Sequence, residues 1–309
     1  MPEFLAAKAG DAELAKLFHL YPDGSYQTFG GTDFMPKFNT AEPAMLDFVE
    51  RVLRHWHEFG IAGWRFDVPY KFEAGFMAAL RERVRDLDSA RYFIAEAWNE
   101  WSFADGFEAV QNYRSGYRIL DYVHKHAADA EDFILDIMRW GKTWGDFSVL
   151  PNFIDSHDTA RFATLVEGRR DSWMLGFALH MLIPGVPVVY SGTELALEGV
   201  NDPGCRATYP TELSADQRSA LEFSSPWMHL RGTSKALSHG GIEVVELKNH
   251  AMIFERAASG QSIRVLVNTG YRDELLNTDV SGTWLDINHK PVELGFTVPQ
   301  RSLFYRKSD

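Results

Sequence analysis

The sequence predicts an α/β chain in which parallel strands alternate with helices, followed by a small antiparallel β-domain. Two observations lead to this fold class. Helix-period and strand-type segments alternate between residues 41 and 240, as expected when crossover helices connect parallel strands. From residue 241 onward, apolar residues instead recur at every second position between turn-forming segments. We therefore expect three parts: residues 1–40 as an N-terminal remnant and approach loop, 41–240 as the α/β domain, and 241–309 as the β-domain.

The helices are indicated by apolar residues at helical spacing. Residues 1–18 have the pattern of one ordinary helix. Thr40 can cap the next helix, Pro43 suits its first turn, and Gly60 ends it. The apolar side of the following helix consists of Phe76, Met77, Leu80 and Val84. Further helices are expected around residues 119–140, 173–182 and 214–237.

Five strand-type segments lie between these helices. They are "IAGWRFDV", "YFIAEAW", "FEAVQNY", "SVLPNFID" and "VPVVYSG". In the last part, the alternation typical of half-buried antiparallel strands is found in "IEVVEL", "AMIFERA", "SIRVLVN" and "SLFYRK". Turn residues in "SGQS" and "VSGTW" separate these strands.

The composition excludes several classes of partner. A formal net charge of -12 and a pI near 5.4 argue against a nucleic-acid or anionic-membrane surface, which would need clustered Lys and Arg. The single cysteine, Cys205, rules out an intramolecular disulfide framework. No apolar run reaches the length needed to span a bilayer, and the first residues lack the pattern of a secretory signal. We therefore expect a cytoplasmic protein.

Carboxylates follow three of the strand-type segments. They are Asp67 in "RFDVP", Glu96 in "IAEAW", and Asp155 or Asp158 in "NFIDSHD". In a parallel α/β barrel, polar groups at the carboxyl ends of the strands face the shared mouth where active sites lie. One such carboxylate is equally well explained as a helix N-cap or a loop ion pair. Three in succession favour an active site.

Arg65, Asp67 and Glu96 are the centre of this hypothesis. Arg65 and Asp67 lie two residues apart on a strand, so both side chains point to the same face and can pair. Glu96 belongs to the neighbouring strand, about 4.8 Å away. Two carboxyl groups so placed fit the separation of about 5 Å used in retaining glycoside hydrolysis, with Asp67 as nucleophile and Glu96 as proton donor. Trp98 and Asn99 suit sugar binding, and a core position is the alternative for Trp98.

These segments resemble the motifs of the α-amylase family of retaining glycoside hydrolases (glycoside hydrolase family 13). "GWRFDVP" resembles its strand-four motif, "FIAEAW" its strand-five motif, "NFIDSHDTARF" its strand-seven motif and "GVPVVYSGTELAL" its strand-eight segment. The resemblance implies that Asp67 is the nucleophile and Glu96 the acid/base. It also implies that His157 and Asp158 bind sugar hydroxyls, and that Asp158 with Arg65 supports the transition state.

Finer details resemble one branch of this family, the cyclomaltodextrinases, neopullulanases and maltogenic amylases. These are "YQTFGGTDFMPKFNT" before the first strand, the serine before His157, and "GVNDPGCR" after the last parallel strand. After Asp67 that branch often has Ala-Asn-Glu, where this sequence has Pro69, Tyr70 and Lys71. We take Tyr70 and Lys71 as candidate substrate-binding residues.

The resemblance implies an incomplete (β/α)8 TIM-type barrel with strands four to eight present, followed by a C-terminal antiparallel β-sandwich. The family's first motif, Asp-x-x-x-x-Asn-His at the end of strand three, has no counterpart, because only 66 residues precede Asp67. We therefore expect an open, curved sheet with the strand before Asp67 at one edge. Such a chain is expected either to lack an N-terminal half or to form a homo-oligomer.

Two functions follow. The first is a retaining hydrolase of α-1,4-glucosidic bonds in maltooligosaccharides, cyclodextrins or related α-glucans, with transglycosylation as a further activity. The alternative is a catalytically impaired fragment that still binds glucans. The chemistry requires no cofactor. A metal site lacks the spacing of His or carboxylate ligands, and a structural calcium is not supported, since a usual ligand of the family lies in the absent part.

Overall fold

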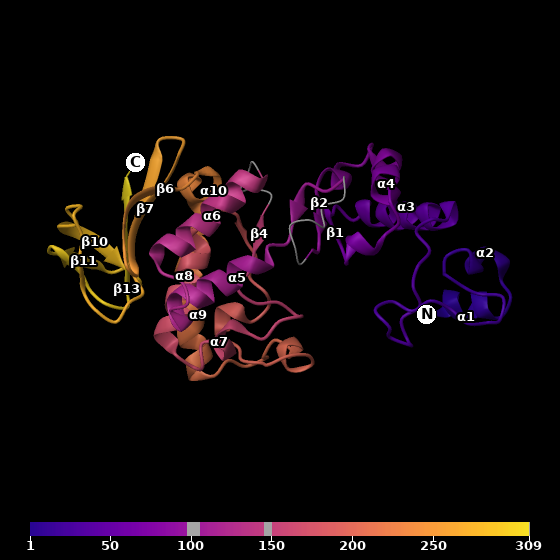
Figure 1. Cartoon of the computed structure of the whole chain (residues 1–309), viewed down its shortest axis with the longest axis horizontal. Helices are drawn as coiled ribbons and strands as arrows, with labels where there is room; N and C mark the ends of the chain where they lie inside the picture. The colour runs from indigo at the N-terminus through magenta and orange to yellow at the C-terminus, as the bar shows by residue number, and fades with distance from the viewer. Residues whose placement is uncertain (98–105, 145–149, 309) are drawn as a thin grey trace. The chain divides into compact units, whose positions relative to one another are not determined.

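The computed structural model describes residues 1–97, 106–144 and 150–308. They form two compact units, Met1–Val110 and Gln111–Asp309, which are described separately below (Figure 1). The domain boundaries expected after residues 40 and 240 remain predictions.

The N-terminal segment contains two short helices, α1 (Pro2–Lys8) and α2 (Ala12–Ala15), so the prediction of one continuous helix was wrong. Gly10 takes φ +107, a conformation that interrupts a helix and favours glycine. Asp11 then caps α2, its carboxylate accepting from the N–H groups of Glu13 and Leu14. The break comes from a Gly-Asp pair within an otherwise helical pattern.

The first unit continues with alternating helices and parallel strands. Its elements are α3 (Pro43–His57), β1 (Trp64–Phe66), η1 (Pro69–Lys71), α4 (Phe76–Val84), η2 (Asp88–Arg91), β2 (Phe93–Ala95) and β3 (Ala109–Val110). All four apolar residues predicted for one side of α4 are buried. They pack with Met45 and Leu53 of α3 and Phe93 of β2 in the core of this unit.

The predicted cap of α3 was wrong. Its N-cap residue is Glu42, whose side chain makes no capping hydrogen bond, while Pro43 lies in the first turn as predicted. The Thr40 hydroxyl instead accepts from the main-chain N–H of Glu73 at 2.9 Å and contacts the Glu73 carboxylate. A capping rule based on neighbouring residues cannot anticipate a partner so distant in sequence.

The three strands of the first unit form a parallel sheet in the order β1-β2-β3. Trp64, Arg65 and Phe66 pair with Phe93, Ile94 and Ala95. β1 lies at an edge of this sheet, and no other strand within the described ranges pairs with it. The strands are shorter than the segments that predicted them. Because β1 and β2 run in parallel without offset, the residues that follow them emerge at the same end.

The second unit begins with helices around a second parallel pair. Its elements are α5 (Tyr113–Leu120), the π-helical segment η4 (Asp121–Lys125), α6 (Ala130–Trp144), β4 (Pro151–Asn152), α7 (Phe162–Leu165), α8 (Arg170–Leu182), β5 (Val186–Pro187), η6 (Thr193–Leu195), η7 (Gly204–Arg206), α9 (Ala215–Thr233) and α10 (Lys235–His239). β4 pairs in parallel with β5, and Asn112 bridges to Asn152 of β4. The single helix predicted for residues 119–140 is therefore two helices joined by η4 and a turn.

The C-terminal part of the second unit is a six-stranded sheet in the order β11-β10-β13-β8-β7-β6, beside the two-stranded sheet β12-β9. The strands are β6 (Glu243–Lys248), β7 (Ala251–Ala258), β8 (Gln261–Asn268), β9 (Glu274–Leu275), β10 (Gly282–Asp286), β11 (Pro291–Leu294), β12 (Thr297–Val298) and β13 (Ser302–Ser308). Figure 1 shows the larger sheet beside the helices of this unit, and α10 contacts β7 and β8.

Alternation along β7 gives this sheet two apolar faces. Met252 and Phe254 belong to the large core formed with α5, α6, α8 and α9. Ala251 and Ile253 point to the other face, whose core includes Trp284. The period-two pattern in the sequence thus predicted the antiparallel strands, whereas the burial of β7 on both faces is seen only in the structure.

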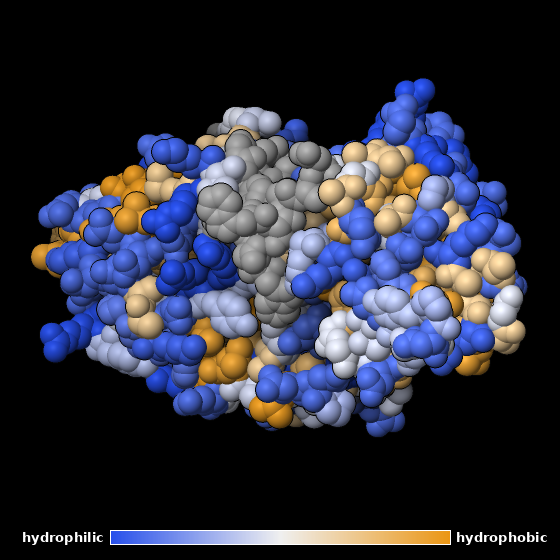
Figure 2. All heavy atoms as spheres, turned by 45° about the vertical axis from the view of Figure 1, so that its right-hand side comes forward, coloured by the Kyte–Doolittle hydropathy of each residue, from blue (hydrophilic) through white to orange (hydrophobic). Residues whose placement is uncertain are grey.

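Figure 2 shows one face of the molecule, on which hydrophilic residues predominate and hydrophobic residues form small separate patches. This distribution agrees with a chain in which charged residues make up 24% of the sequence. Among the residues that the structure describes, no helix is both long and apolar enough to cross a membrane.

Gly116 of α5 provides a test of the packing that supports the second unit. A Cβ atom at this position would lie 2.9 Å from the Phe153 carbonyl oxygen and 3.0 Å from that of Ile154. Since these neighbours are main-chain atoms, Gly116→Ala should lower the free energy of unfolding by about 1–3 kcal/mol, as overpacking does. The midpoint of urea unfolding measures the change.

Gly232 of α9 is the matched control, because a Cβ there would meet nothing within 4 Å. Gly232→Ala should raise stability by about 0.5–1 kcal/mol through helix propensity. Equal midpoints for Gly116→Ala and the unchanged protein would contradict the packing described here.

Candidate active site

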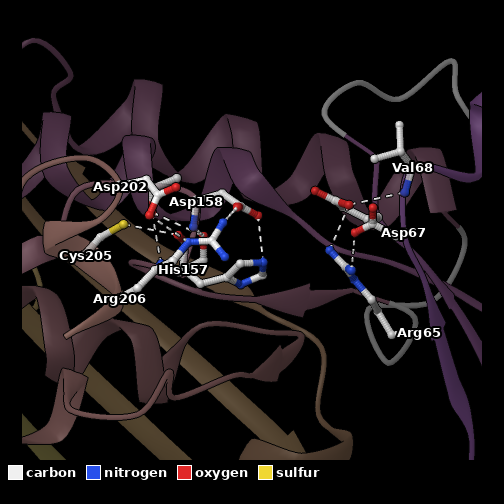
Figure 3. Close-up of polar contacts among 11 residues, drawn as sticks. Arg65, Asp67, Val68, His157, Asp158, Asp202, Cys205 and Arg206 are labelled. Carbon is white, nitrogen blue, oxygen red and sulfur yellow. Dashed lines mark hydrogen bonds and ion pairs between the residues drawn. The ribbon is translucent and has the colours of Figure 1, made fainter. Parts of the chain in front are cut away.

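One guanidinium and two carboxylates meet at the carboxyl ends of β1 and β2 (Figure 3). Arg65 Nη1 lies 2.5 Å from Asp67 Oδ1, and Arg65 Nη2 lies 2.8 Å from Glu96 Oε2. The first contact was predicted from the alternation of side chains along a strand. The second depends on the register of β1 against β2, which brings the residue after Ala95 alongside the residue after Phe66. The two carboxylates therefore lie side by side on one guanidinium.

The two carboxylates differ in how firmly the protein holds them. The main-chain N–H of Glu96 donates to the Phe66 carbonyl at 3.0 Å, and the N–H of Val68 donates to Glu96 Oε2 at 3.2 Å. The Glu96 side chain is only 5% exposed, whereas that of Asp67 is 65% exposed. A buried carboxylate requires charged or hydrogen-bonding partners, and Arg65 and Val68 supply them. Glu96 is thus fixed, while Asp67 is open to a reaction partner.

Val68, which donates one of these hydrogen bonds, has a strained backbone conformation. It takes φ 43 and ψ 50, the left-handed region that β-branched residues avoid, at a strain of order 1–3 kcal/mol. The chain then enters η1, which holds the predicted substrate-binding residues Tyr70 and Lys71. Tyr70 is 41% exposed, and Lys71 Nζ lies 5.5 Å from the centroid of its ring.

An apolar pocket of about 430 Å³ opens beside Asp67. Asp67 and Lys71 are two of its polar lining residues, and Phe66, Phe72 and Phe76 contribute apolar walls. The approach loop adds Phe29, Phe34, Met35, Pro36, Lys37 and Phe38. A mainly apolar, aromatic pocket with a few polar groups is typical of a small-molecule site.

In the second unit, Asp155 is a structural residue. It is 2% exposed, its Oδ1 accepts from the Thr193 hydroxyl at 2.5 Å, and its Oδ2 accepts from the Phe162 N–H at 3.0 Å. Burial raises the pKa of Asp155 above its ordinary value, and the two hydrogen bonds oppose that rise. The sequence left undecided whether Asp155 or Asp158 belongs to the site. Asp155 connects the segments around it and does not face solvent.

Asp158 is the accessible one of the two, with 26% of its side chain exposed. Its Oδ2 lies 2.9 Å from His157 Nε2, and its Oδ1 lies 2.8 Å from Arg206 Nη2 (Figure 3). Arg206 Nε also contacts Asp202 Oδ1 at 3.2 Å. Each carboxylate oxygen of Asp158 thus has a cationic or imidazole partner, and one of them comes from a distant loop.

Arg206 and Cys205 were not among the predicted site residues. The sequence signal was present, because both belong to the segment "GVNDPGCR", but spacing alone gave that segment no role. Cys205 is fully buried, and its Sγ donates to the His157 carbonyl at 3.1 Å. The predicted residues Trp98 and Asn99 lie outside the described residues.

Within the described part of the chain, no group of three or more His, Cys, Asp or Glu side chains is arranged to hold a metal ion.

Comparison with protein families and curated proteins places the chain among known sequences. Residues 23–236 match the family model described as the catalytic domain of alpha amylase. Neopullulanase 2 of Thermoactinomyces vulgaris is 29% identical over 85% of this chain and 47% of its own length. A cyclomaltodextrinase of Bacillus sp is 30% identical over 79% of this chain and 45% of its own. The chain spans about half the length of the curated relatives it matches.

Comparison with solved structures shows a shared fold. The ligand-free cyclic α-maltosyl-(1→6)-maltose hydrolase of Arthrobacter globiformis matches with a TM-score of 0.81 and 24% identity. The match covers 99% of this chain and 72% of that chain.

The environment of Asp155 predicts a pH-dependent contribution to stability. Its pKa is raised in the folded state, so the folded protein binds this proton more tightly than the unfolded chain does. The contribution of Asp155 is therefore fully present below about pH 4, the ordinary range of the group, and is lost as pH rises through the folded pKa. Asp155→Asn removes this dependence, so the stability of the unchanged protein relative to the variant should fall as the pH rises from about 4 through the folded pKa of Asp155. Urea unfolding followed by tryptophan fluorescence measures both, and a difference that does not vary with pH would contradict the assignment.

Proposed function

The chain belongs to the family of alpha-amylase catalytic domains, and from this membership we propose that it is a retaining glycoside hydrolase acting on α-1,4-glucosidic bonds. Its proposed substrates are maltooligosaccharides, cyclodextrins or related α-glucans, with transfer to a second sugar as a further activity. The observation that carries the proposal is the pair of carboxylates, Asp67 and Glu96, held side by side by Arg65. Close carboxyl groups favour the retaining mechanism over the inverting one, which needs room for a water molecule between them.

The exposure of Asp67 and the fixed position of Glu96 suit the steps proposed for them. The exposed Asp67 attacks the anomeric carbon, and the bond to the leaving oxygen breaks as Glu96 donates a proton to it. In the second step Glu96 accepts a proton from water, the water oxygen bonds to the anomeric carbon, and Asp67 is released. Arg65 and the Val68 N–H hold the Glu96 side chain in one position for both steps.

The proposed sugar-binding residues are Arg65, Tyr70 and Lys71 in the first unit and His157 and Asp158 in the second. The imidazole of His157 and the carboxylate of Asp158 form one hydrogen-bonding pair that suits vicinal hydroxyls. The Phe side chains that line the pocket beside Asp67 suit the apolar face of a sugar ring. Trp98 and Asn99 stay predicted members of this set.

Family membership gives the α/β part the TIM-type barrel architecture. We further propose that β1, β2, β3, β4 and β5 correspond to strands four to eight of such a barrel. The parallel pairing of β1, β2 and β3, the pairing of β4 with β5 and the edge position of β1 support this correspondence. We also propose the cytoplasm as the location, as the sequence predicts.

A second candidate function is glucan binding without turnover. The observation that favours it is the aromatic lining of the pocket, which can hold a sugar whether or not the carboxylates react. Isothermal titration that shows maltooligosaccharide binding, together with no release of reducing sugar over days, would select this candidate over hydrolysis.

Substitution of the two carboxylates tests the hydrolase. Asp67→Asn should abolish release of reducing sugar from maltotriose and β-cyclodextrin, because no nucleophile remains. Glu96→Gln should lower the rate by about 10²- to 10⁴-fold, the usual contribution of a general acid–base group. Asp88→Asn is the matched control, because Asp88 is 81% exposed and pairs only with its helical neighbour Arg91 in the described contacts. Hydrolysis by Asp67→Asn at the rate of the unchanged protein would end the assignment.

A further inference from the structure

Two neighbouring residues on one loop contact two neighbouring residues at the proposed site. Cys205 Sγ donates to the His157 carbonyl at 3.1 Å, and Arg206 Nη2 lies 2.8 Å from Asp158 Oδ1 (Figure 3). The pair His157–Asp158 is therefore held at its backbone by one contact and at its carboxylate by the other. The segment that does this, "GVNDPGCR", has no part in the chemistry proposed above.

Buried bonds anchor this loop independently of Arg206. Arg161 is 1% exposed, its Nε donates to the Cys205 carbonyl at 2.9 Å, and its main-chain N–H donates to the Gly199 carbonyl at 2.8 Å. The Gly199 N–H donates to the Thr164 hydroxyl at 2.8 Å. A Cβ on Gly199 would lie 2.4 Å from the Gly204 carbonyl oxygen, so the close approach of the two ends of the loop requires glycine.

The contact of Arg206 with Asp158 is of a different kind. The Arg206 side chain is 47% exposed and that of Asp158 26% exposed, and such a solvated pair contributes little to folding. Its effect is geometric, since Arg206 holds one carboxylate oxygen while His157 holds the other. The Arg206 guanidinium is itself steadied by Asp202, whose Oδ1 lies 3.2 Å from Nε. The planar fork of an arginine can bridge two carboxylates in this way.

We propose that Arg206 is a positioning residue, which fixes the plane of the Asp158 carboxylate for sugar hydroxyls, and that the anchored loop Gly199–Arg206 delivers it. The inference rests on the proposed function, because the orientation of Asp158 affects a rate only if that carboxylate meets the substrate. In this role Arg206 transfers no proton and acts on the rate through the orientation of Asp158. Its removal should leave the fold intact and reduce the precision of the site.

Arg206→Ala tests the proposal in the full chain with maltotriose. The expected result is that kcat and kcat/KM fall together by about 10- to 100-fold, the range that misplacement of about 1 Å can cost. Arg206→Lys keeps the charge but lacks the planar fork of the guanidinium, so its kcat should lie between those of Arg206→Ala and the unchanged protein. Methylguanidinium added to Arg206→Ala should restore part of the rate.

Arg139→Ala is the matched control, because Arg139 forms an exposed pair with Asp136 at 3.0 Å on α6. Activity of Arg206→Ala within about twofold of the unchanged protein overturns the proposal.

The reactivity of the buried Cys205 thiol distinguishes a positioning role of Arg206 from a role in keeping the loop folded. Cys205 is the single cysteine of the chain, so its reaction with an aromatic disulfide reagent reports on this loop alone. In Arg206→Ala the thiol should stay as protected as in the unchanged protein, because Arg161 and Thr164 still anchor the loop. Faster reaction of the thiol in that variant would mean that the loop has come loose, which overturns the positioning role.

Crystal structures of the unchanged protein and of Arg206→Ala keep this proposal distinct from the proposed function, since they require no turnover. We expect an unmoved loop and an Asp158 carboxylate that turns away from its original plane. A carboxylate that keeps its orientation without Arg206 overturns the proposal, whatever the activity. A turned carboxylate in a protein that hydrolyses no α-glucan would support the positioning contact and contradict the hydrolase.

Discussion

The guanidinium of Arg65 is the interaction on which the acidic pair of the first unit depends. Two carboxylates placed side by side repel each other, and one of them, Glu96, is almost completely buried. Removing the positive charge from such a site would take a cationic partner from a desolvated anion, a loss that costs several kcal/mol for buried pairs. The rest of the site follows from holding this cation in place. β1 sets its direction, the pairing with β2 sets the position of Glu96, and the strained turn at Val68 adds one N–H to the same oxygen.

Much of this arrangement could be predicted from the sequence, because it depends on local rules. The alternation of side chains puts Arg65 and Asp67 on one face, and the apolar segments before Asp67 and Glu96 indicate strands. The contact between Arg65 and Glu96 was beyond such rules, since it depends on the register between two strands joined by a helix. Thr40 is a case in which a local rule gave a wrong prediction. A local rule predicted that it caps α3, but its hydroxyl bonds to Glu73, a residue that is near only in the folded chain.

The strand-seven segment shows why a carboxylate in a motif cannot be assigned from spacing alone. Asp155 and Asp158 follow the same strand, and both have the chemistry for a site. Their environments separate them, because Asp155 is enclosed by Thr193 and Phe162 while Asp158 stays accessible between His157 and Arg206. The partners that decide between them lie up to 48 residues further along the chain. Burial and partner identity are products of the whole fold, and no periodicity in "NFIDSHD" contains them.

Arginine holds a carboxylate in each of the two units, but the support behind the arginine differs. Arg65 lies on a strand, so the hydrogen bonds of the sheet fix its backbone and the adjacent register fixes its partners. Arg206 is the last residue of the short segment η7, within a loop that no sheet hydrogen bonds fix. The loop must therefore be tied down elsewhere, and the fully buried Cys205 and the buried Arg161 do this without taking part in the exposed pair. Different residues therefore anchor the loop and contact Asp158. Buried bonds keep the loop in one place, while the solvated Arg206 guanidinium orients the Asp158 carboxylate and contributes little to the free energy of folding.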